Sequence, residues 1–136
     1  MRKLLFITLF TLFACGVEAQ TVYRNEVIKS LNGGAVKLQC LNGMYKLTIR
    51  TDNRYQPSFD CMLGNRDNAI RLLRFMSELK LTKNDVVDLE NATENTLRLG
   101  LFGNLEIFSE GGNFSGLIAK KQCRQLAELL EETRDE

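Results

Sequence analysis

Apolar and polar residues alternate through residues 35–50, AVKLQCLNGMYKLTIR, on both sides of a central Asn42-Gly43 pair. Asn-Gly is the favoured pair for a two-residue type I′ turn, because both positions of that turn need a positive φ. Such a turn predicts a β-hairpin with three apolar pairs on one face: Cys40 with Tyr45, Leu38 with Leu47, and Val36 with Ile49. The other face then carries polar side chains: Lys37, Gln39, Lys46, Thr48 and Arg50. A slip of one residue would mix the two sets, so the pattern determines the register.

Two more strands and a helix are predicted in the first half of the chain. Residues 26–31 form a strand that the turn at 32–34 closes, and residues 59–63 form another that follows Pro57. Asn65 or Asp67 can cap a helix by accepting hydrogen bonds from free backbone N–H groups. The helix is predicted to extend to about Lys80, and its apolar residues recur at helical spacing: Ala69, Leu72, Leu73, Met76 and Leu79.

The second half of the chain repeats this order of elements. Short strands are predicted at residues 86–89, 96–101, 105–107 and 114–118. A final helix is indicated by one apolar face: Ala119, Cys123, Leu126, Ala127 and Leu130. Each half therefore reads β-β-β-β-α, and the two helix faces superpose at an offset of 54 residues.

This order predicts an α+β domain in which one or two antiparallel sheets pack against two helices. The segments 22–80 and 81–133 are interpreted as two copies of one ββββα unit, with convergence on a simple arrangement as the alternative. Neither segment could bury much core alone, because units of this size are marginal. Packed together they form either one continuous sheet with both helices on one face, or two sheets with the helices between or beside them.

The N-terminal residues 1–19 are predicted to be an export signal, with a basic start and an apolar run too short to span a bilayer. Cleavage after Ala19 would release a periplasmic or secreted domain, residues 20–136, that begins at Gln20. The competing route interprets LFAC as a bacterial lipobox, which would make Cys15 the lipidated residue and anchor the protein to the envelope. The bulky phenylalanine within LFAC favours cleavage after Ala19.

Charge argues against nucleic acid as a partner. Loss of residues 1–19 removes two of the 18 basic and one of the 17 acidic residues, which leaves 16 of each. Nucleic-acid binders usually carry a strong basic excess, so no nucleic-acid partner is expected. No later stretch is apolar enough to cross a membrane, and no membrane span is expected after the signal. The expected partners are an unknown protein, a component of the envelope, or a second copy of the chain.

The mature chain keeps three cysteines, each on a predicted apolar face: Cys40, Cys61 and Cys123. An odd number leaves at least one thiol unpaired. Free cysteine packs as a small hydrophobic residue, so core thiols are predicted. One disulfide that involves Cys123 is the alternative.

The sequence holds little that points to catalysis. Its lack of histidine removes the Ser-His and Cys-His pairs and the commonest zinc ligand. Neither a calcium-loop motif nor a phosphate-loop motif is present, so no metal and no cofactor are expected. Carboxylates can still catalyse glycoside hydrolysis without histidine. The candidates on or beside strands are Asp60, Glu106 and Glu110.

Three apolar residues lie out of phase with the inward-facing set: Met62, Phe102 and Phe108. If the helices cover one face of a sheet, these residues lie on the other face. Three further residues extend this candidate interaction face: Leu41, Met44 and Leu117. Exposed apolar patches often mark partner sites. The alternative is a sheet that folds over itself and buries both faces.

The last helix is charged against its dipole, with basic residues at its start (Lys120, Lys121, Arg124) and glutamates at its end. Use by a partner and simple solvation both fit this pattern. Taken together, these features predict an exported, non-catalytic binding or interaction module. A structural or assembly subunit of the envelope is the first alternative, and an enzyme with an unrecognised carboxylate site is the second.

Overall fold

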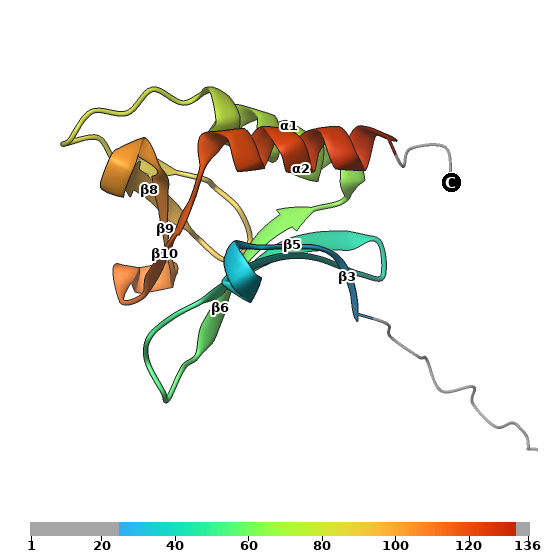
Figure 1. Cartoon of the computed structure of the whole chain (residues 1–136), viewed down its shortest axis with the longest axis horizontal. Coiled ribbons are helices and arrows are strands. Elements are labelled where there is room, and N and C mark those ends of the chain that lie inside the picture. Colours follow the sequence, from blue (N-terminus) through green and yellow to red (C-terminus); the bar gives the residue numbers. More distant parts are fainter. Residues whose placement is uncertain (1–24, 133–136) are drawn as a thin grey trace, which may run out of the picture.

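Eight strands form two separate four-stranded antiparallel sheets in the computed structural model, which describes residues 25–132 (Figure 1). The predicted export signal, with Cys15, Ala19 and Gln20, lies outside the described residues. The first sheet has the order β3-β4-β5-β6: Asn25–Leu31, Val36–Leu41, Met44–Arg50 and Ser58–Gly64. The second has the order β10-β9-β8-β7: Ser115–Ile118, Leu105–Phe108, Thr96–Leu99 and Val87–Asp88. The chain is therefore an α+β protein, as the sequence predicts.

The central hairpin of the first sheet has the predicted register. Cys40 is paired with Tyr45, Leu38 with Leu47, and Val36 with Ile49. The turn residues Asn42 and Gly43 have φ values of 57° and 80°, the left-handed conformation that a type I′ turn requires.

Each sheet leads directly into a helix of 13 residues. These helices are α1 (Arg66–Glu78) and α2 (Lys120–Glu132), which start 54 positions apart. Asn65 caps α1 by accepting a hydrogen bond of 2.9 Å from the backbone N–H of Asn68. Both predicted helix faces are buried: Ala69, Leu72, Leu73 and Met76 on α1, and Cys123, Leu126, Ala127 and Leu130 on α2. The ββββα order thus occurs twice, and equivalent positions of the two helices are buried.

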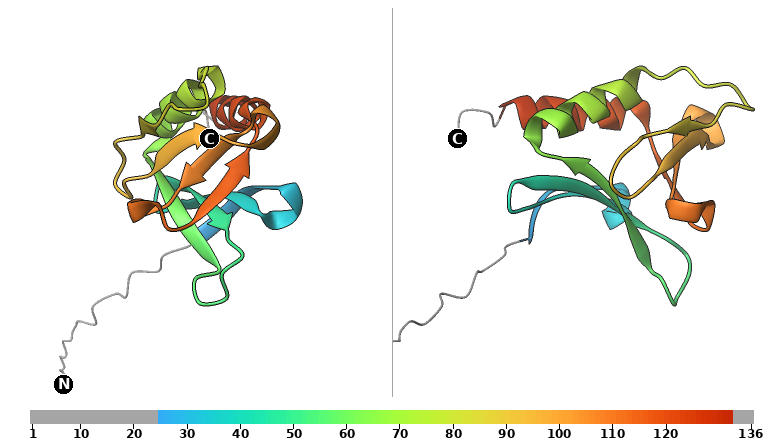
Figure 2. Two further views of the ribbon diagram at one scale, coloured as in Figure 1. Left: turned by 90° about the vertical axis from the view of Figure 1, so that its left-hand side faces the viewer. Right: turned by 180° about the vertical axis from the view of Figure 1, so that it is seen from behind.

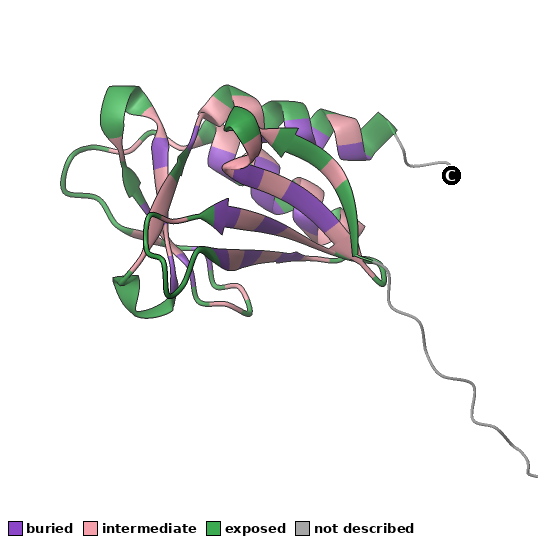
Figure 3. Ribbon diagram, turned by 60° about the horizontal axis from the view of Figure 1, so that its bottom comes forward, coloured by how far each residue is buried: buried purple, intermediate pink, exposed green. Residues whose placement is uncertain are grey.

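The two helices lie side by side over the inner face of the first sheet, and the second sheet packs at one end of this layer (Figures 1 and 2). Buried residues occur in the strands of both sheets and in both helices (Figure 3). They form one cluster with members from both sheets and both helices, including Leu38, Leu47, Leu97, Ile107, Leu73 and Leu126. Of the arrangements left open by the sequence, the structure has two sheets rather than one.

The close approach of the two sheets depends on Gly116 in β10. A Cβ at this position would lie 2.2 Å from Cγ2 of Ile49 in β5, closer than side chains tolerate. The absence of a side chain therefore lets β10 pack directly on the first sheet.

The helices run antiparallel, and each begins where the other ends. The Arg66 side chain at the start of α1 donates to the carbonyl oxygen of Leu130, near the end of α2. The Lys120 ammonium at the start of α2 donates to the carbonyl oxygen of Leu79, just past the end of α1, at 2.9 Å. A cation at Lys120 is therefore unfavourable for its own helix dipole but favourable for that of its neighbour. This explains part of the reversed charge pattern of the last helix.

Two predicted strands are shorter than expected. The pattern predicts an extended segment over 96–101, but β8 ends at Leu99 and residues Leu101–Gly103 form a short 3-10 turn. The Gly100 N–H donates to the carbonyl oxygen of Asn104 at 2.8 Å, which closes the turn one residue after the strand. Phe102 accordingly lies in a turn and not on a strand face. Similarly, β7 spans two residues instead of the four predicted.

Candidate binding surface at the β8–β9 turn

The most exposed apolar side chains of the second sheet gather around the β8–β9 turn. Phe102 is 96% exposed and Leu101 is 66% exposed. Leu99 precedes them at the end of β8, and Leu117 of β10 lies against Gly100, where a Cβ would be 2.6 Å from Cδ2 of Leu117. We call Leu99, Leu101, Phe102 and Leu117 the apolar tip.

Phe102 adopts a backbone conformation that is unfavourable for its side chain. Its φ is 56° and its ψ is 31°, in the left-handed region. Only a few per cent of non-glycine residues have a positive φ, and asparagine, aspartate and histidine are the most enriched among them. The turn is held by the Gly100–Asn104 bond and by a second, 3.0 Å, from the Asn104 N–H to the carbonyl oxygen of Leu101. The fold thus holds an aromatic ring in water at a position where glycine would be less strained.

Phe108 and Leu117 share the outer face of the second sheet with polar residues. The Arg98 guanidinium lies over the Phe108 ring, 5.4 Å from its centroid. Beside it, the Ser115 hydroxyl donates to a carboxylate oxygen of Glu106 at 2.7 Å. Phe108 is half-buried and is not among the side chains packed on the core cluster.

The other three predicted interaction residues lie on the first sheet. Leu41 and Met44 are paired beside the Asn42-Gly43 turn, and Met62 is paired with Lys46. All three belong to the outer face of that sheet, because their neighbours along each strand are the inward-facing residues. The six candidates are thus divided between two sheets, and only Phe102 and Leu117 belong to the apolar tip.

A row of polar side chains crosses the outer face of the first sheet. Gln39 accepts a hydrogen bond from Asn25 at 2.5 Å and donates to the Thr48 hydroxyl at 3.0 Å. Thr48 donates to Asp60 at 3.3 Å, and the Lys46 ammonium forms an ion pair with Asp60 at 3.1 Å. These contacts join all four strands, so much of this face is occupied with its own hydrogen bonds.

The structure separates Glu106 from the other two candidate carboxylates. Asp60 and Glu110 line one cleft of about 260 Å³ between the sheets, together with Thr93, Ser109 and Phe114. Glu106 lies on the outer face of the second sheet, bound to Ser115. Asp60 is already paired with Lys46. A carboxylate pair in this cleft would therefore consist of Asp60 and Glu110.

A polar loop, residues 91–95, links the two sheets through side-chain hydrogen bonds, a structural role that the sequence analysis did not predict. The Asn91 amide donates to the carbonyl oxygen of Met62 at 2.8 Å, and the Thr93 hydroxyl accepts from the Met62 N–H at 3.0 Å. Asn95, which is buried, donates to the carbonyl oxygen of Phe108 in β9 at 2.9 Å. Asn91 and Thr93 thereby satisfy backbone groups on the free edge of β6, while Asn95 binds the second sheet. The only sequence signal is the Asn-x-Thr-x-Asn spacing, which is also typical of a solvated loop.

The three described cysteines are free thiols. Burial raises the pKa of the Cys61 thiol to about 12, and burial likewise raises the pKa of Cys123 to about 12. Both thiols therefore stay protonated near neutral pH, and a thiol is a poor nucleophile and a poor metal ligand. Cys40 is half-buried beside Tyr45, whose pKa is raised chiefly by burial and then by its proximity to Cys40.

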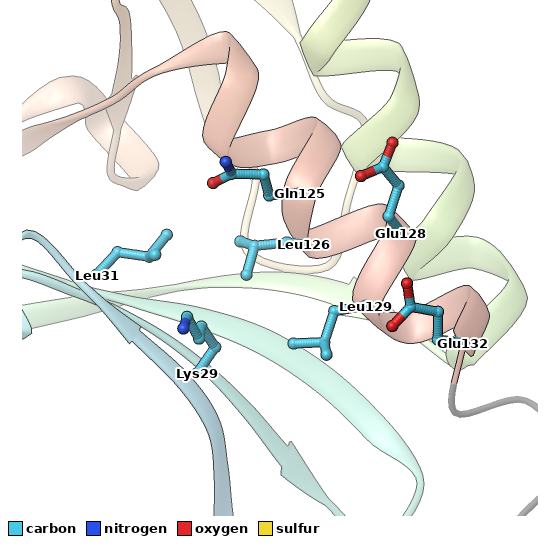
Figure 4. A pocket seen from close by; sticks show the side chains of 7 residues that line it. All are labelled: Lys29, Leu31, Gln125, Leu126, Glu128, Leu129 and Glu132. Carbon is cyan, nitrogen blue, oxygen red and sulfur yellow. The ribbon is translucent and has the colours of Figure 1, made fainter.

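A groove of about 360 Å³ separates α2 from the edge strand β3 (Figure 4). Lys29 and Leu31 line it from the strand. The helix contributes Gln125, Leu126, Glu128, Leu129 and Glu132. The groove has an apolar floor with charged groups of both signs at its rim.

Comparisons with protein-family models, with curated proteins and with solved structures found no match. Within residues 25–132, no cluster of three histidine, cysteine or acidic side chains has a geometry that could hold a metal ion. Neither helix in that range is long and apolar enough to cross a membrane.

Proposed function

We propose that this chain is an exported, non-catalytic binding module that holds a partner protein on the apolar tip. The observation that carries the proposal is Phe102, an aromatic side chain 96% exposed on a left-handed backbone. Such strained positions cluster at binding and switch sites, where the surrounding structure maintains them. Export rests on the pattern of residues 1–19.

The apolar tip has the character of a binding hot spot. Aromatic side chains dominate the energy of protein interfaces, usually near the centre of the contact. Leu101 precedes Phe102 in the turn, Leu99 ends β8, and Leu117 lies against Gly100, so all three add exposed apolar surface near Phe102. Outside them, Arg98 and Glu106 provide charged groups for a polar rim.

The test compares two variants as bait in a native envelope extract. Phe102→Ser removes the centre of the apolar tip, and Tyr55→Ser removes an aromatic side chain that is 83% exposed in the β5–β6 loop. We expect the same proteins to be captured by the unmodified protein and by Tyr55→Ser, and to be lost with Phe102→Ser. Equal capture by both variants would contradict the proposal. Binding to lipid vesicles that depends on Phe102 would instead assign the tip to a membrane surface.

One observation favours a second candidate, an enzyme that uses carboxylates. Asp60 and Glu110 line the same cleft, which also contains hydroxyl groups. The test is a screen of glycoside substrates with the Asp60→Asn and Glu110→Gln variants. Activity that both variants abolish would support this candidate over the binding module.

A further inference from the structure

Strand β3 is the one long sheet edge that no other element covers within residues 25–132. The edge of β6 is covered by Asn91 and Thr93, and the edge strand β10 has only four residues. The remaining edge strand, β7, has only two residues. By contrast, β3 has seven residues that are exposed or half-buried. An uncovered edge of this length is a template for pairing with another strand.

A bulge in β3 brings two opposite charges to the same face. Glu26 is paired with Cys40 and Lys29 with Leu38, so the three residue steps between them span only two positions of β4. Side chains two register positions apart point to the same face of a sheet. Both therefore lie on the inner face, and neither forms an ion pair with any described residue. Val27, paired with Gln39 midway between them, points outward and is 51% exposed.

We propose that β3 pairs antiparallel with β3 of a second copy, around a two-fold axis at Val27. Ile28 is the extra residue of the bulge and takes no register position, so this register places Glu26 of each copy opposite Lys29 of the other, on the same face. It also places Val27 opposite its own equivalent and Asn25 opposite Ser30. The first pair joins opposite charges, the second joins apolar side chains, and the third joins polar side chains. The strand is therefore complementary to itself, as a two-fold interface requires.

The charges of Glu26 and Lys29 favour a second copy of β3 as the pairing strand over an unrelated extended peptide. An inward-pointing lysine and a bulge are devices that protect sheet edges against indiscriminate pairing. A strand that pairs here must offer a carboxylate to Lys29 and a cation to Glu26. A second β3 offers both at the required positions. The groove beside β3 opens along this edge, so the second copy would also cover apolar surface of Leu31 and Leu129.

The test is sedimentation equilibrium of the exported protein over a series of concentrations. The unmodified protein should show a monomer–dimer equilibrium. Glu26→Lys or Lys29→Glu alone places like charges opposite each other twice in every dimer, which should raise the dimer Kd by about tenfold or more. The double variant restores both ion pairs and should return the Kd to within about threefold of the original. Lys83→Glu, which makes the same charge change in the exposed loop after α1, should have no effect.

A mixture of the two single variants tests the proposed charge pairing most directly. An equimolar mixture of the two single variants can form a heterodimer with both ion pairs, so it should dimerise more tightly than either variant alone. In the unmodified protein, hydrogen exchange at β3 amides should slow as concentration rises, which tests the interface without any substitution. A protein that stays monomeric up to about 1 mM would overturn the proposal. So would a dimer that charge reversal does not weaken, or one in which Phe102→Ser abolishes association.

Discussion

Replacing Phe102 by glycine should stabilise the fold while it removes the proposed binding function. The ring is 96% exposed, so its loss removes almost no buried apolar area. Full burial of such a side chain is worth about 1.5–3 kcal/mol, and the buried remainder here accounts for only about 0.1 kcal/mol. The left-handed backbone, by contrast, costs a non-glycine residue about 1–2 kcal/mol.

Glycine removes that strain but adds entropy to the unfolded chain, which costs about 0.5–1 kcal/mol. The difference predicts that Phe102→Gly raises the free energy of unfolding by about 0.5 kcal/mol. The melting temperature should then rise by about 2–4 °C. The neighbouring substitution Gly103→Ala should act in the opposite direction, because Gly103 has a φ of 77° and already supplies the freedom that the turn needs.

Urea denaturation of the unmodified protein and the two variants measures these changes, and the envelope capture assay reports binding. We expect Phe102→Gly to be at least as stable as the original and to capture no partner. A loss of more than about 1 kcal/mol would show that the ring has a structural role, and the reasoning from strain would be wrong.

Three further predictions concern the hairpin, the outer face of the second sheet and the buried thiols. Gly43→Val should lower the free energy of unfolding by about 1–3 kcal/mol, because a β-branched residue resists the positive φ of the turn; an unchanged melting curve would contradict this. Phe108→Ser should cost less than about 1 kcal/mol in a denaturation curve, whereas a core position would cost about 3–5 kcal/mol. Native Cys61 and Cys123 should resist alkylation near neutral pH. Because their folded pKa values of about 12 exceed the unfolded value of 9.0, the free energy of unfolding should fall as pH rises from 9.0 to about 12, which pH-dependent melting would detect.

Local sequence patterns were sufficient to predict the parts of the fold that depend on residues close together in the chain. The Asn42-Gly43 turn needs two left-handed residues, and its register follows from the alternation around it. The helix faces follow from a period that any buried helix must have. These features are encoded within short windows, so no knowledge of distant contacts was required.

Long-range packing explains what the sequence left open. How closely the two sheets pack depends on Gly116, whose missing side chain lets β10 approach Ile49 of β5. The structural role of Asn95 depends on a carbonyl in β9 that lies far from any recognisable motif. The candidate interaction face follows from strand phase alone. Phase cannot show that Met62 and Leu117 lie on different sheets, or that Phe102 lies in a turn.

The exchanged contacts at the helix ends have a consequence for how the chain can be divided. Arg66 and Lys120 occupy equivalent positions of the two units, and each supplies a cation to a carbonyl oxygen at the C-terminal end of the other unit's helix. A fragment that contains a single ββββα unit would therefore lack both the second half of its core and the cation at its own helix end. Cleavage in the exposed segment 82–86 should yield two pieces that fold only when mixed. A single unit would need the other unit as a second chain to complete its core, whereas carrying both units in one chain makes that assembly independent of concentration.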